Sequence, residues 1–221
     1  MAIQEAEKLF DLSLQSQIAK SLPSCELLPV YNAMLNVYAS YGLGSQAKDL
    51  LIKMNEKDRD NSRRLIPNVK SYTSAINAWA RSSDVNAANL AKSLLYRMDY
   101  IYQSGEANLK PDVMCYRSVI NTFSRKGDVK SIMNLLHLMQ CESANITLDT
   151  KCYTSIIHAF SKSNDMNSAS YARKLLDEMN LFQIEGLEGV SPNTFSYTAV
   201  INACTSAQDV KSKKVALQIA R

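Results

Sequence analysis

A stretch of twelve residues recurs along this chain, and no other feature of the sequence constrains the fold as strongly. The sequence reads SYTSAINAWARS at 71–82, CYTSIIHAFSKS at 152–163 and SYTAVINACTSA at 196–207, with looser copies elsewhere. A tyrosine anchors each copy, and the five anchor tyrosines are Tyr31, Tyr72, Tyr116, Tyr153 and Tyr197. They lie 41, 44, 37 and 44 residues apart, which indicates a structural unit repeated along the chain.

Each copy has the apolar periodicity of one helical face. An aliphatic residue follows each anchor tyrosine by four positions, and an aromatic residue follows it by seven in the first four copies. Offsets of zero, four and seven fall on one side of an α-helix. A second amphipathic segment follows in four units: AKDLLIKM at 47–54, AKSLLYRM at 91–98, IMNLLHLM at 132–139 and ARKLLDEM at 172–179.

The sequence therefore predicts an all-α protein made of stacked antiparallel helix pairs. A single pair has too little apolar surface to fold alone, so neighbouring pairs bury one another's faces in an α-solenoid. Aromatic positions such as Trp79 and Phe123 are then expected in the core. We assign residues 1–23 to the second helix and linker of an incomplete repeat. Full repeats follow at 24–68, 69–112, 113–149 and 150–193, and a truncated fifth repeat occupies 194–221.

Composition and charge exclude several functional classes. The net charge of +4 is too small for a histone-like polycation. The five cysteines include no C-x-x-C pair, which favours reduced and mostly buried thiols. The chain has two histidines, no Gly-rich phosphate loop, and no Ser/His/Asp or Cys/His set, so we expect no enzyme, cofactor or metal site. No apolar run reaches the length of a membrane span.

The repeat pattern resembles that of the pentatricopeptide-repeat family. The first helix follows V-x-x-Y-[TN]-x-x-I-N-x-[WFY], the second follows A-x-x-L-L-x-x-M, and P-[DN] closes three of the four complete units. The resemblance runs in phase through five units, from about residue 24 to the end, and implies a right-handed α-solenoid. The units are longer than is usual in the family, and we place the surplus in linkers after the second helix, such as 99–110 and 180–191, and in the turns of the second and fourth units, 82–89 and 163–170. Leu148 stands where the family has proline.

The resemblance implies binding of single-stranded RNA, with one base for each repeat. Two residues of a repeat carry most of the choice of base: the residue after the anchor tyrosine and the last residue of the unit. In chain order the pairs are Asn32 with Asn68, Thr73 with Asp112, Arg117 with Asp149, and Thr154 with Asn193; Thr198 opens a fifth.

Hydrogen-bond chemistry supports the second of these positions independently. An ionised aspartate only accepts hydrogen bonds, whereas an asparagine can also donate through its NH2 group. Aspartate therefore suits guanine or uracil, which present an N–H at the middle of the Watson–Crick edge, and asparagine suits adenine or cytosine. The family rule adds that threonine goes with purines and asparagine with pyrimidines. The resemblance thus predicts a core of 5′-Y-G-N-A-3′ (C before U at Y), followed by a purine, with the base of the third repeat unassigned.

The family also places an apolar side chain two residues before each anchor tyrosine, where it clamps the base. Those positions hold Pro29, Lys70, Met114, Lys151 and Phe195. Methionine and phenylalanine fit a stacking role, and the lysines fit it through their alkyl stems. The asparagines and aspartates at the unit ends have a second interpretation, because these residues are common N-caps of helices. One residue can serve both roles.

We therefore expect a sequence-selective single-stranded RNA-binding protein that acts in RNA processing, stability or translation. Its partners would be RNA and other proteins of RNA metabolism, without duplex DNA or membrane. The alternative is a helical-repeat scaffold for protein–protein interactions, since solenoids also bind peptides. The resemblance implies a mitochondrial or plastid location. Residues 5–20 read as a second helix without its first, so we expect a fragment of a longer array in which Met1 is not the biological start.

Overall fold

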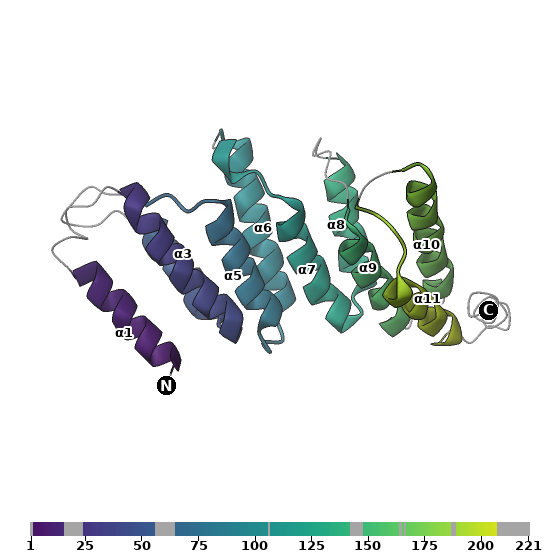
Figure 1. Ribbon diagram of the computed structural model, residues 1–221, viewed down its shortest axis with the longest axis horizontal. Helices are drawn as coiled ribbons and strands as arrows, with labels where there is room; N and C mark the ends of the chain where they lie inside the picture. The colour runs from purple at the N-terminus through teal and green to yellow at the C-terminus, as the bar shows by residue number, and fades with distance from the viewer. Residues whose placement is uncertain are drawn as a thin grey trace. The chain divides into compact units, whose positions relative to one another are not determined.

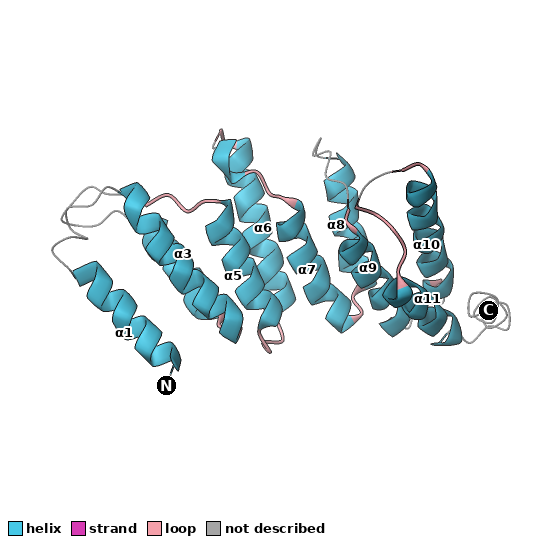
Figure 2. Ribbon diagram, viewed as in Figure 1, coloured by secondary structure: helices cyan, strands magenta, loops and turns pink. Residues whose placement is uncertain are grey.

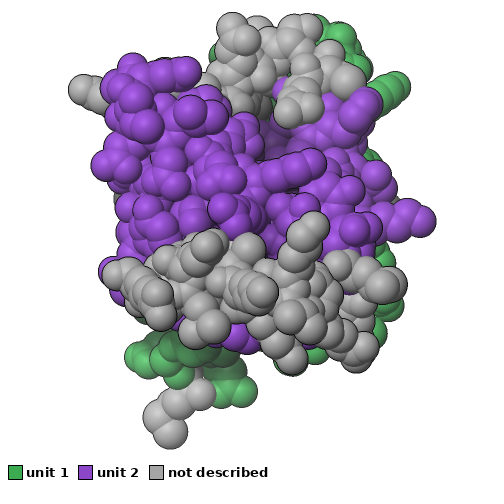
Figure 3. Space-filling model, turned by 90° about the vertical axis from the view of Figure 1, so that its right-hand side faces the viewer, with its two compact units in different colours: residues 1–119 green, residues 120–221 purple. Residues whose placement is uncertain are grey.

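The computed structural model describes residues 2–15, 24–55, 65–105, 107–141, 148–163, 165, 167–186 and 189–206. Across these residues the secondary structure is helical, with short connecting loops and no strand (Figure 2). The chain divides into two compact units, Met1–Val119 and Ile120–Arg221, which Figure 3 shows in different colours. The end of the truncated fifth repeat, residues 207–221, lies outside the described residues.

Unit 1 consists of helix pairs that stack through their first helices (Figure 1). Its elements are α1 (Ala2–Gln15), α3 (Ser24–Tyr41), α4 (Gly44–Asn55), α5 (Val69–Arg81), α6 (Ala87–Gln103) and the 3-10 turn η1 (Ala107–Leu109). Helix α3 lies beside α5, both α4 and α6 pack on α5, and α1 packs against α3. Helix α7 (Val113–Lys126) begins in unit 1 and ends in unit 2.

Unit 2 repeats the same arrangement of first and second helices. After the end of α7 it contains α8 (Val129–Cys141), α9 (Thr150–Lys162), α10 (Ser168–Ile184) and α11 (Thr194–Ser206). Helix α9 packs against α10, and α11 packs on both of them, as Figure 1 shows. In unit 1, α3 packs against its own second helix, α4, and the next first helix, α5; in unit 2, α9 packs in the same way against α10 and α11.

The apolar stripe of the first helices forms the core, as the periodicity predicts. The aliphatic residues four positions after the anchor tyrosines are 0% exposed in four repeats: Leu35, Ile76, Ile120 and Ile157. The prediction for the aromatic positions is confirmed, because Trp79 is 4% exposed and Phe123 is 1% exposed. Burial of each such side chain contributes about 1.5–3 kcal/mol to the free energy of unfolding.

The second helices are longer than the sequence predicts, so the surplus of each unit is not all linker. Helix α6 continues to Gln103 and α10 continues to Ile184. Both stop shortly before a glycine with positive φ, Gly105 (φ 110°) or Gly186 (φ 74°). No glycine or proline interrupts the segments before them, so the helix extends until a residue that readily adopts a positive φ ends it.

The start of one helix differs from the sequence expectation, and α3 begins earlier relative to its anchor tyrosine than the later first helices do. Helix α1 begins at Ala2, three residues before the predicted start at residue 5. Helix α3 begins at Ser24, seven residues before its anchor Tyr31, whereas the later first helices begin three residues before theirs. Pro29 therefore lies inside α3 rather than beside its entrance.

Three cysteines with described side chains, Cys115, Cys152 and Cys204, are buried thiols that form no disulfide, as predicted. None of the described helices combines the length and the apolarity needed to cross a lipid bilayer. The described side chains also contain no group of three or more His, Cys, Asp or Glu that could hold a metal ion.

Candidate functional site

The last residue of each complete repeat caps the first helix of the next repeat. Asn68 and Ser71 form a reciprocal capping box: Asn68 Oδ1 accepts from the Ser71 backbone N–H at 3.0 Å, and the Asn68 N–H donates to Ser71 Oγ at 3.2 Å. The other three side chains accept one N–H bond each, Asp112 from Cys115 (2.9 Å), Asp149 from Cys152 (2.8 Å) and Asn193 from Ser196 (3.0 Å). The N-cap interpretation is therefore confirmed for all four residues.

Capping uses only part of the hydrogen-bonding capacity of these side chains. A carboxylate has two oxygens, and only Oδ1 of Asp112 accepts from the helix. An asparagine that caps through its carbonyl oxygen retains two N–H donors, as Asn68 and Asn193 do. Asp112 and Asn193 are also exposed, so their remaining polar atoms can meet a ligand.

The threonines that follow the anchor tyrosines share one hydrogen-bonding state. In each, the hydroxyl donates at 2.7 Å to the carbonyl oxygen four residues earlier: Thr73 to Val69, Thr154 to Thr150 and Thr198 to Thr194. A hydroxyl has one hydrogen, so the bond to the backbone leaves the oxygen only as an acceptor. Toward any ligand these threonines present a lone pair and a methyl group.

The other two residues at this position behave differently. Asn32 is 5% exposed, and its Oδ1 accepts from the Ser71 hydroxyl at 2.6 Å. Arg117 is half-buried, and its guanidinium donates to Met114 Sδ. The first repeat thus presents an amide, and the third presents a cation that is held by the neighbouring clamp position.

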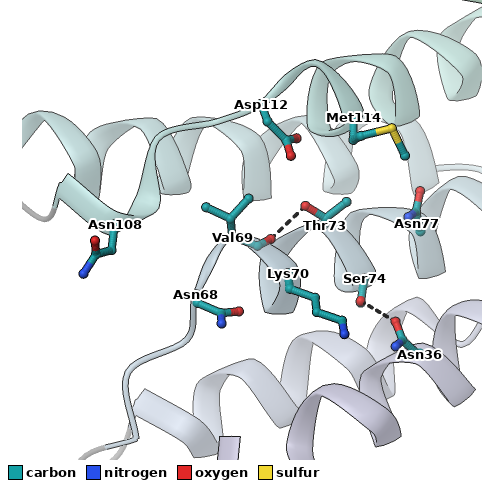
Figure 4. A pocket seen from close by; sticks show the side chains of 10 residues that line it. All are labelled: Asn36, Asn68, Val69, Lys70, Thr73, Ser74, Asn77, Asn108, Asp112 and Met114. Carbon is teal, nitrogen blue, oxygen red and sulfur yellow. Dashed lines mark hydrogen bonds between the residues drawn. The ribbon is translucent and has the colours of Figure 1, made fainter. Parts of the chain in front are cut away.

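A hollow of about 600 Å³ in unit 1 brings one complete predicted pair together with its predicted clamps (Figure 4). Thr73 and Asp112, the pair of the second repeat, both line it. Lys70 and Met114, the clamp positions of two adjacent repeats, line it as well. Residues as far apart in sequence as Lys70 and Met114 thus converge where two consecutive first helices lie side by side.

Sequence reasoning missed a row of asparagines in the same hollow. Asn36 and Asn77 line it, each five residues after an anchor tyrosine. Each carbonyl oxygen accepts from a serine of the next first helix, Ser74 and Ser118 respectively, at 2.6 Å. In unit 2, Asn121 accepts from Ser155 in the same way. The asparagine of the recurring I-N motif could have indicated this row. Its hydrogen-bond partner lies in the next repeat, however, so the sequence of one repeat does not show the bond.

This row is interrupted in the fourth repeat, where His158 replaces the asparagine and Ala199 replaces the serine. Partial burial and the nearby Lys162 ammonium lower the pKa of His158 below its ordinary value of 6.5. His158 therefore presents a neutral imidazole at pH 7. The side chain is exposed, so this ring is accessible from solvent.

A further row consists of cations at the ends of first helices. Arg81, Arg125 and Lys162 each follow an anchor tyrosine by nine residues, and all three are exposed. Offsets of one, five and nine place the base-reading position, the asparagine row and the cations on one helical face, about 6 Å apart along the axis. The constant offset of these cations from the anchor tyrosines was the available signal in the sequence, and it was missed.

The remaining predicted residues lie in unit 2. Phe195 is 76% exposed on α11, Lys151 is exposed on α9, and Asp149 and Thr154 are half-buried. A second hollow, of about 700 Å³, opens between α8 and α10 and is lined by none of the predicted site residues. Its walls include the stacked rings of Phe160 and Tyr171.

Comparisons with known proteins agree with this repeat architecture. The model of the PPR repeat matches residues 29–58 and 114–143, and the model of the pentatricopeptide repeat domain matches residues 138–206. No curated protein sequence matches the chain at a significant level.

Solved structures include the crystal structure of the pentatricopeptide repeat protein PPR10 from maize, with a TM-score of 0.62 and 22% identity. This match covers 87% of the present chain and 24% of the maize chain, so the present chain spans about a quarter of that relative's length. The structure of PPR10 in complex with an 18-nt psaJ RNA element matches with a TM-score of 0.44 and 17% identity, over 98% of this chain and 33% of that one. The first likeness shows that the fold is a helical-repeat solenoid.

Proposed function

The chain belongs to the pentatricopeptide-repeat family, and on that premise we propose that it binds single-stranded RNA selectively, one base for each repeat. The observation that carries the proposal is the hollow of unit 1. There the reading pair Thr73 and Asp112 lines the same hollow as the clamp positions Lys70 and Met114. The proposal extends to a role of the parent protein in RNA processing, stability or translation in a mitochondrion or plastid, which rests on the family alone.

The hydrogen bonds of the second repeat favour guanine. Thr73 Oγ1 donates to the helix, so toward the hollow it is an acceptor, and the second carboxylate oxygen of Asp112 is an acceptor as well. Guanine is the base whose Watson–Crick edge carries two adjacent donors, N1–H and N2–H2. Uracil offers one N–H between two carbonyl oxygens, and these oxygens would repel the carboxylate.

The same reasoning applies to the first and fourth repeats. Asn32 and Asn68 both engage their carbonyl oxygens within the protein and present NH2 donors, which suit the adjacent acceptors N3 and O2 of cytosine. Thr154 is an acceptor and Asn193 is a donor, which suit N6–H2 and N1 of adenine. The local hydrogen bonds therefore support the order 5′-Y-G-N-A-3′, with C favoured at Y.

The clamp residues and the cations would bind parts of the RNA that are common to all sequences. Met114 is 42% exposed and can pack on a base face, while the lysine stem of Lys70 can cover the other face. Arg81, Arg125 and Lys162 provide a positive charge in three consecutive repeats. Base stacking contributes about 1–3 kcal/mol for each base, so four or five repeats would give moderate affinity.

Selection from a randomised single-stranded RNA pool, at low and moderate salt, tests the proposal. The expected result is enrichment of a Y-G-N-A core, and Asp112→Asn should move the second base from guanine toward adenine. Asp128→Asn is the matched control, because Asp128 caps α8 through the same bond to an N–H three residues on (Ser131, 3.0 Å) but belongs to a second helix. It should leave the selected sequence unchanged.

Failure of the proposal has a clear signature. If no sequence is enriched and the affinity only falls with salt, the chain has generic attraction for phosphate and no base readout. If no RNA binds even at low salt, the scaffold alternative becomes the better account, and peptide binding to the same helical face would be examined.

A further inference from the structure

One buried serine joins the two proposed base-reading residues of the first repeat. Ser71 is 0% exposed and belongs to neither reading position. Its hydroxyl donates to Asn32 Oδ1 at 2.6 Å, across 39 residues of sequence. Its backbone N–H donates to Asn68 Oδ1 at 3.0 Å, and its oxygen accepts from the Asn68 backbone N–H at 3.2 Å. Ser71 therefore contacts both members of the pair.

The bond from Ser71 decides which end of the Asn32 amide turns inward. The Ser71 hydroxyl has one hydrogen and two acceptors within reach, Asn32 Oδ1 at 2.6 Å and Asn68 Oδ1 at 3.0 Å. The shorter distance assigns the hydrogen to Asn32, because Asn68 Oδ1 already accepts from the Ser71 backbone N–H. The NH2 group of Asn32 has no hydrogen-bond partner in the part of the chain that the structure describes. It is also not among the buried polar atoms that lack a partner, so it keeps some access to solvent. Asn32 thus turns a donor outward.

We propose that Ser71 is a positioning residue that sets the hydrogen-bond polarity of Asn32 and so makes the first repeat select cytosine over uracil. This inference rests on the proposed RNA binding. An outward NH2 group suits the acceptor N3 of cytosine and opposes the N3–H of uracil. Without the Ser71 hydroxyl, the Asn32 amide can turn by half a revolution and present its carbonyl oxygen, which accepts from uracil N3–H.

The next repeat has the same architecture with the opposite polarity. Cys115 is the third residue of α7, as Ser71 is of α5, and is 0% exposed. Its Sγ lies 3.1 Å from Thr73 Oγ1, and its N–H caps onto Asp112 Oδ1. Burial raises the pKa of the Cys115 thiol to about 12, so the thiol is protonated at pH 7 and can donate. Met98 Sδ also lies 3.8 Å from Cys115 Sγ, but a thioether is a weak acceptor and is farther away than the hydroxyl. Thr73 already donates to Val69, so in its contact with Cys115 it can only accept.

The two repeats therefore use one device, in which the third residue of the following helix holds the reading residue of the helix before. Ser71 holds an asparagine as a donor, and Cys115 holds a threonine as an acceptor. Base choice in each repeat would then depend on three side chains rather than on two. The third side chain would not touch the RNA itself, because both Ser71 and Cys115 are fully buried.

The test compares Ser71→Ala with the matched control Ser74→Ala. Ser74 lies one helical turn further along α5, is 5% exposed, and donates at 2.6 Å to Asn36 Oδ1. Both variants thus lose a buried serine-to-asparagine bond. Dissociation constants are measured for RNAs that carry C or U at the first base, and separately for RNAs that carry G or A at the second. Circular dichroism checks that each variant is folded at the working temperature.

The unmodified chain should prefer C over U at the first base by about tenfold or more. Ser71→Ala should reduce this ratio to within about threefold while the preference for G at the second base is retained. Ser74→Ala should keep the preference for C at the first base, because Ser74 bonds to neither Asn32 nor Asn68; Ser74 lines the hollow of the second repeat, so this variant is compared only at the first base. Ser71→Cys fills the same space with a weaker donor, so its ratio of C to U affinity should fall between those of the unmodified chain and Ser71→Ala. If Ser71→Ala does not fold, Ser71→Cys is the variant that tests the proposal.

The outcomes separate this inference from the function on which it rests. If the unmodified chain shows no base preference at either position, the proposed RNA readout is wrong whatever Ser71 does. If the chain prefers C and G, but folded Ser71→Ala or Ser71→Cys keeps the full preference for C, the positioning role is overturned and RNA readout stands. The side-chain amide resonances of Asn32 provide a readout without RNA: they should shift in Ser71→Ala and not in Ser74→Ala.

Discussion

Gly44 packs directly against the indole ring of Trp79. A β carbon built on Gly44 would stand 2.2 Å from Trp79 Cδ2 and 2.3 Å from Cε3, closer than two carbons can approach without a bond. Gly44 is the first residue of α4, and Trp79 lies in the first helix of the next repeat. The missing side chain lets two consecutive repeats approach closely within unit 1.

Gly44→Ala should therefore destabilise the protein, although alanine is the better helix former. Overpacking of a buried contact costs about 1–3 kcal/mol in free energy of unfolding, against a helix-propensity gain of up to about 1 kcal/mol. Urea unfolding at 25 °C measures the difference. Ser45→Ala, at the exposed neighbouring position of α4, is the control and should change the free energy by less than about 0.5 kcal/mol.

A double-mutant cycle identifies the contact responsible. Trp79→Leu removes the ring face, so Gly44→Ala should cost less in that background than in the unmodified chain. The indole Nε1 of Trp79 is buried without a hydrogen-bond partner in the described structure, so its loss removes no hydrogen bond. If Gly44→Ala lowers the free energy of unfolding equally in both backgrounds, the destabilisation does not come from a clash with the indole ring.

Capping and base reading can be separated at Asp149. Asp149→Ala removes the bond to the Cys152 N–H and should lower the free energy of unfolding by about 1 kcal/mol. Asp149→Asn keeps an oxygen in place, and asparagine caps about as well as aspartate, so the change should stay below about 0.5 kcal/mol. Denaturant unfolding of the three proteins measures both effects.

Asp177→Ala is the control for Asp149→Ala. Asp177 lies on the exposed side of α10, 62% exposed, with only a 3.8 Å ion pair to Arg173. Such surface pairs contribute little, so its removal should leave the free energy nearly unchanged. A loss at Asp177 equal to that at Asp149 would mean that negative charge, not capping, matters.

The buried cysteines should resist alkylation in the folded protein. Burial raises the pKa of Cys115 to about 12, and only the thiolate attacks iodoacetamide. Mass spectrometry after treatment at pH 7.5 should find Cys115 unmodified in native protein and modified in urea. Rapid labelling under native conditions would show that the contact between Cys115 and Thr73 opens often, which would also weaken its assignment as a positioning residue.

The pKa of His158 should lie below 6.5, because partial burial and the Lys162 ammonium disfavour its charged form. A histidine with a folded-state pKa below its unfolded value stabilises the fold above pH 6.5, and this contribution is lost as the pH falls below that value. An NMR titration of the imidazole measures the pKa directly. Lys162→Gln should raise it, whereas Lys126→Gln, at the end of another first helix, should not; equal responses would remove Lys162 as a cause.

Much of the fold could be predicted from the sequence, because the relevant forces are local. The apolar spacing around each anchor tyrosine specifies one buried helical face, and Leu35, Ile76 and Ile120 occupy it as predicted. The capping roles of Asn68 and Asp149 also depend on groups only three residues away. Helix ends were less certain, since α6 and α10 continue until a glycine stops them.

The polarity of the candidate site was decided only by the tertiary structure. The sequence by itself determined that Asn32 and Thr73 occupy the same position in successive repeats, and that asparagine can donate or accept. Whether it does one or the other depends on a partner 39 residues away, the Ser71 hydroxyl, which the stacking of α3 on α5 brings within 2.6 Å. A repeat sequence specifies each helix from within, but the hydrogen bonds between repeats exist only after the helices have packed.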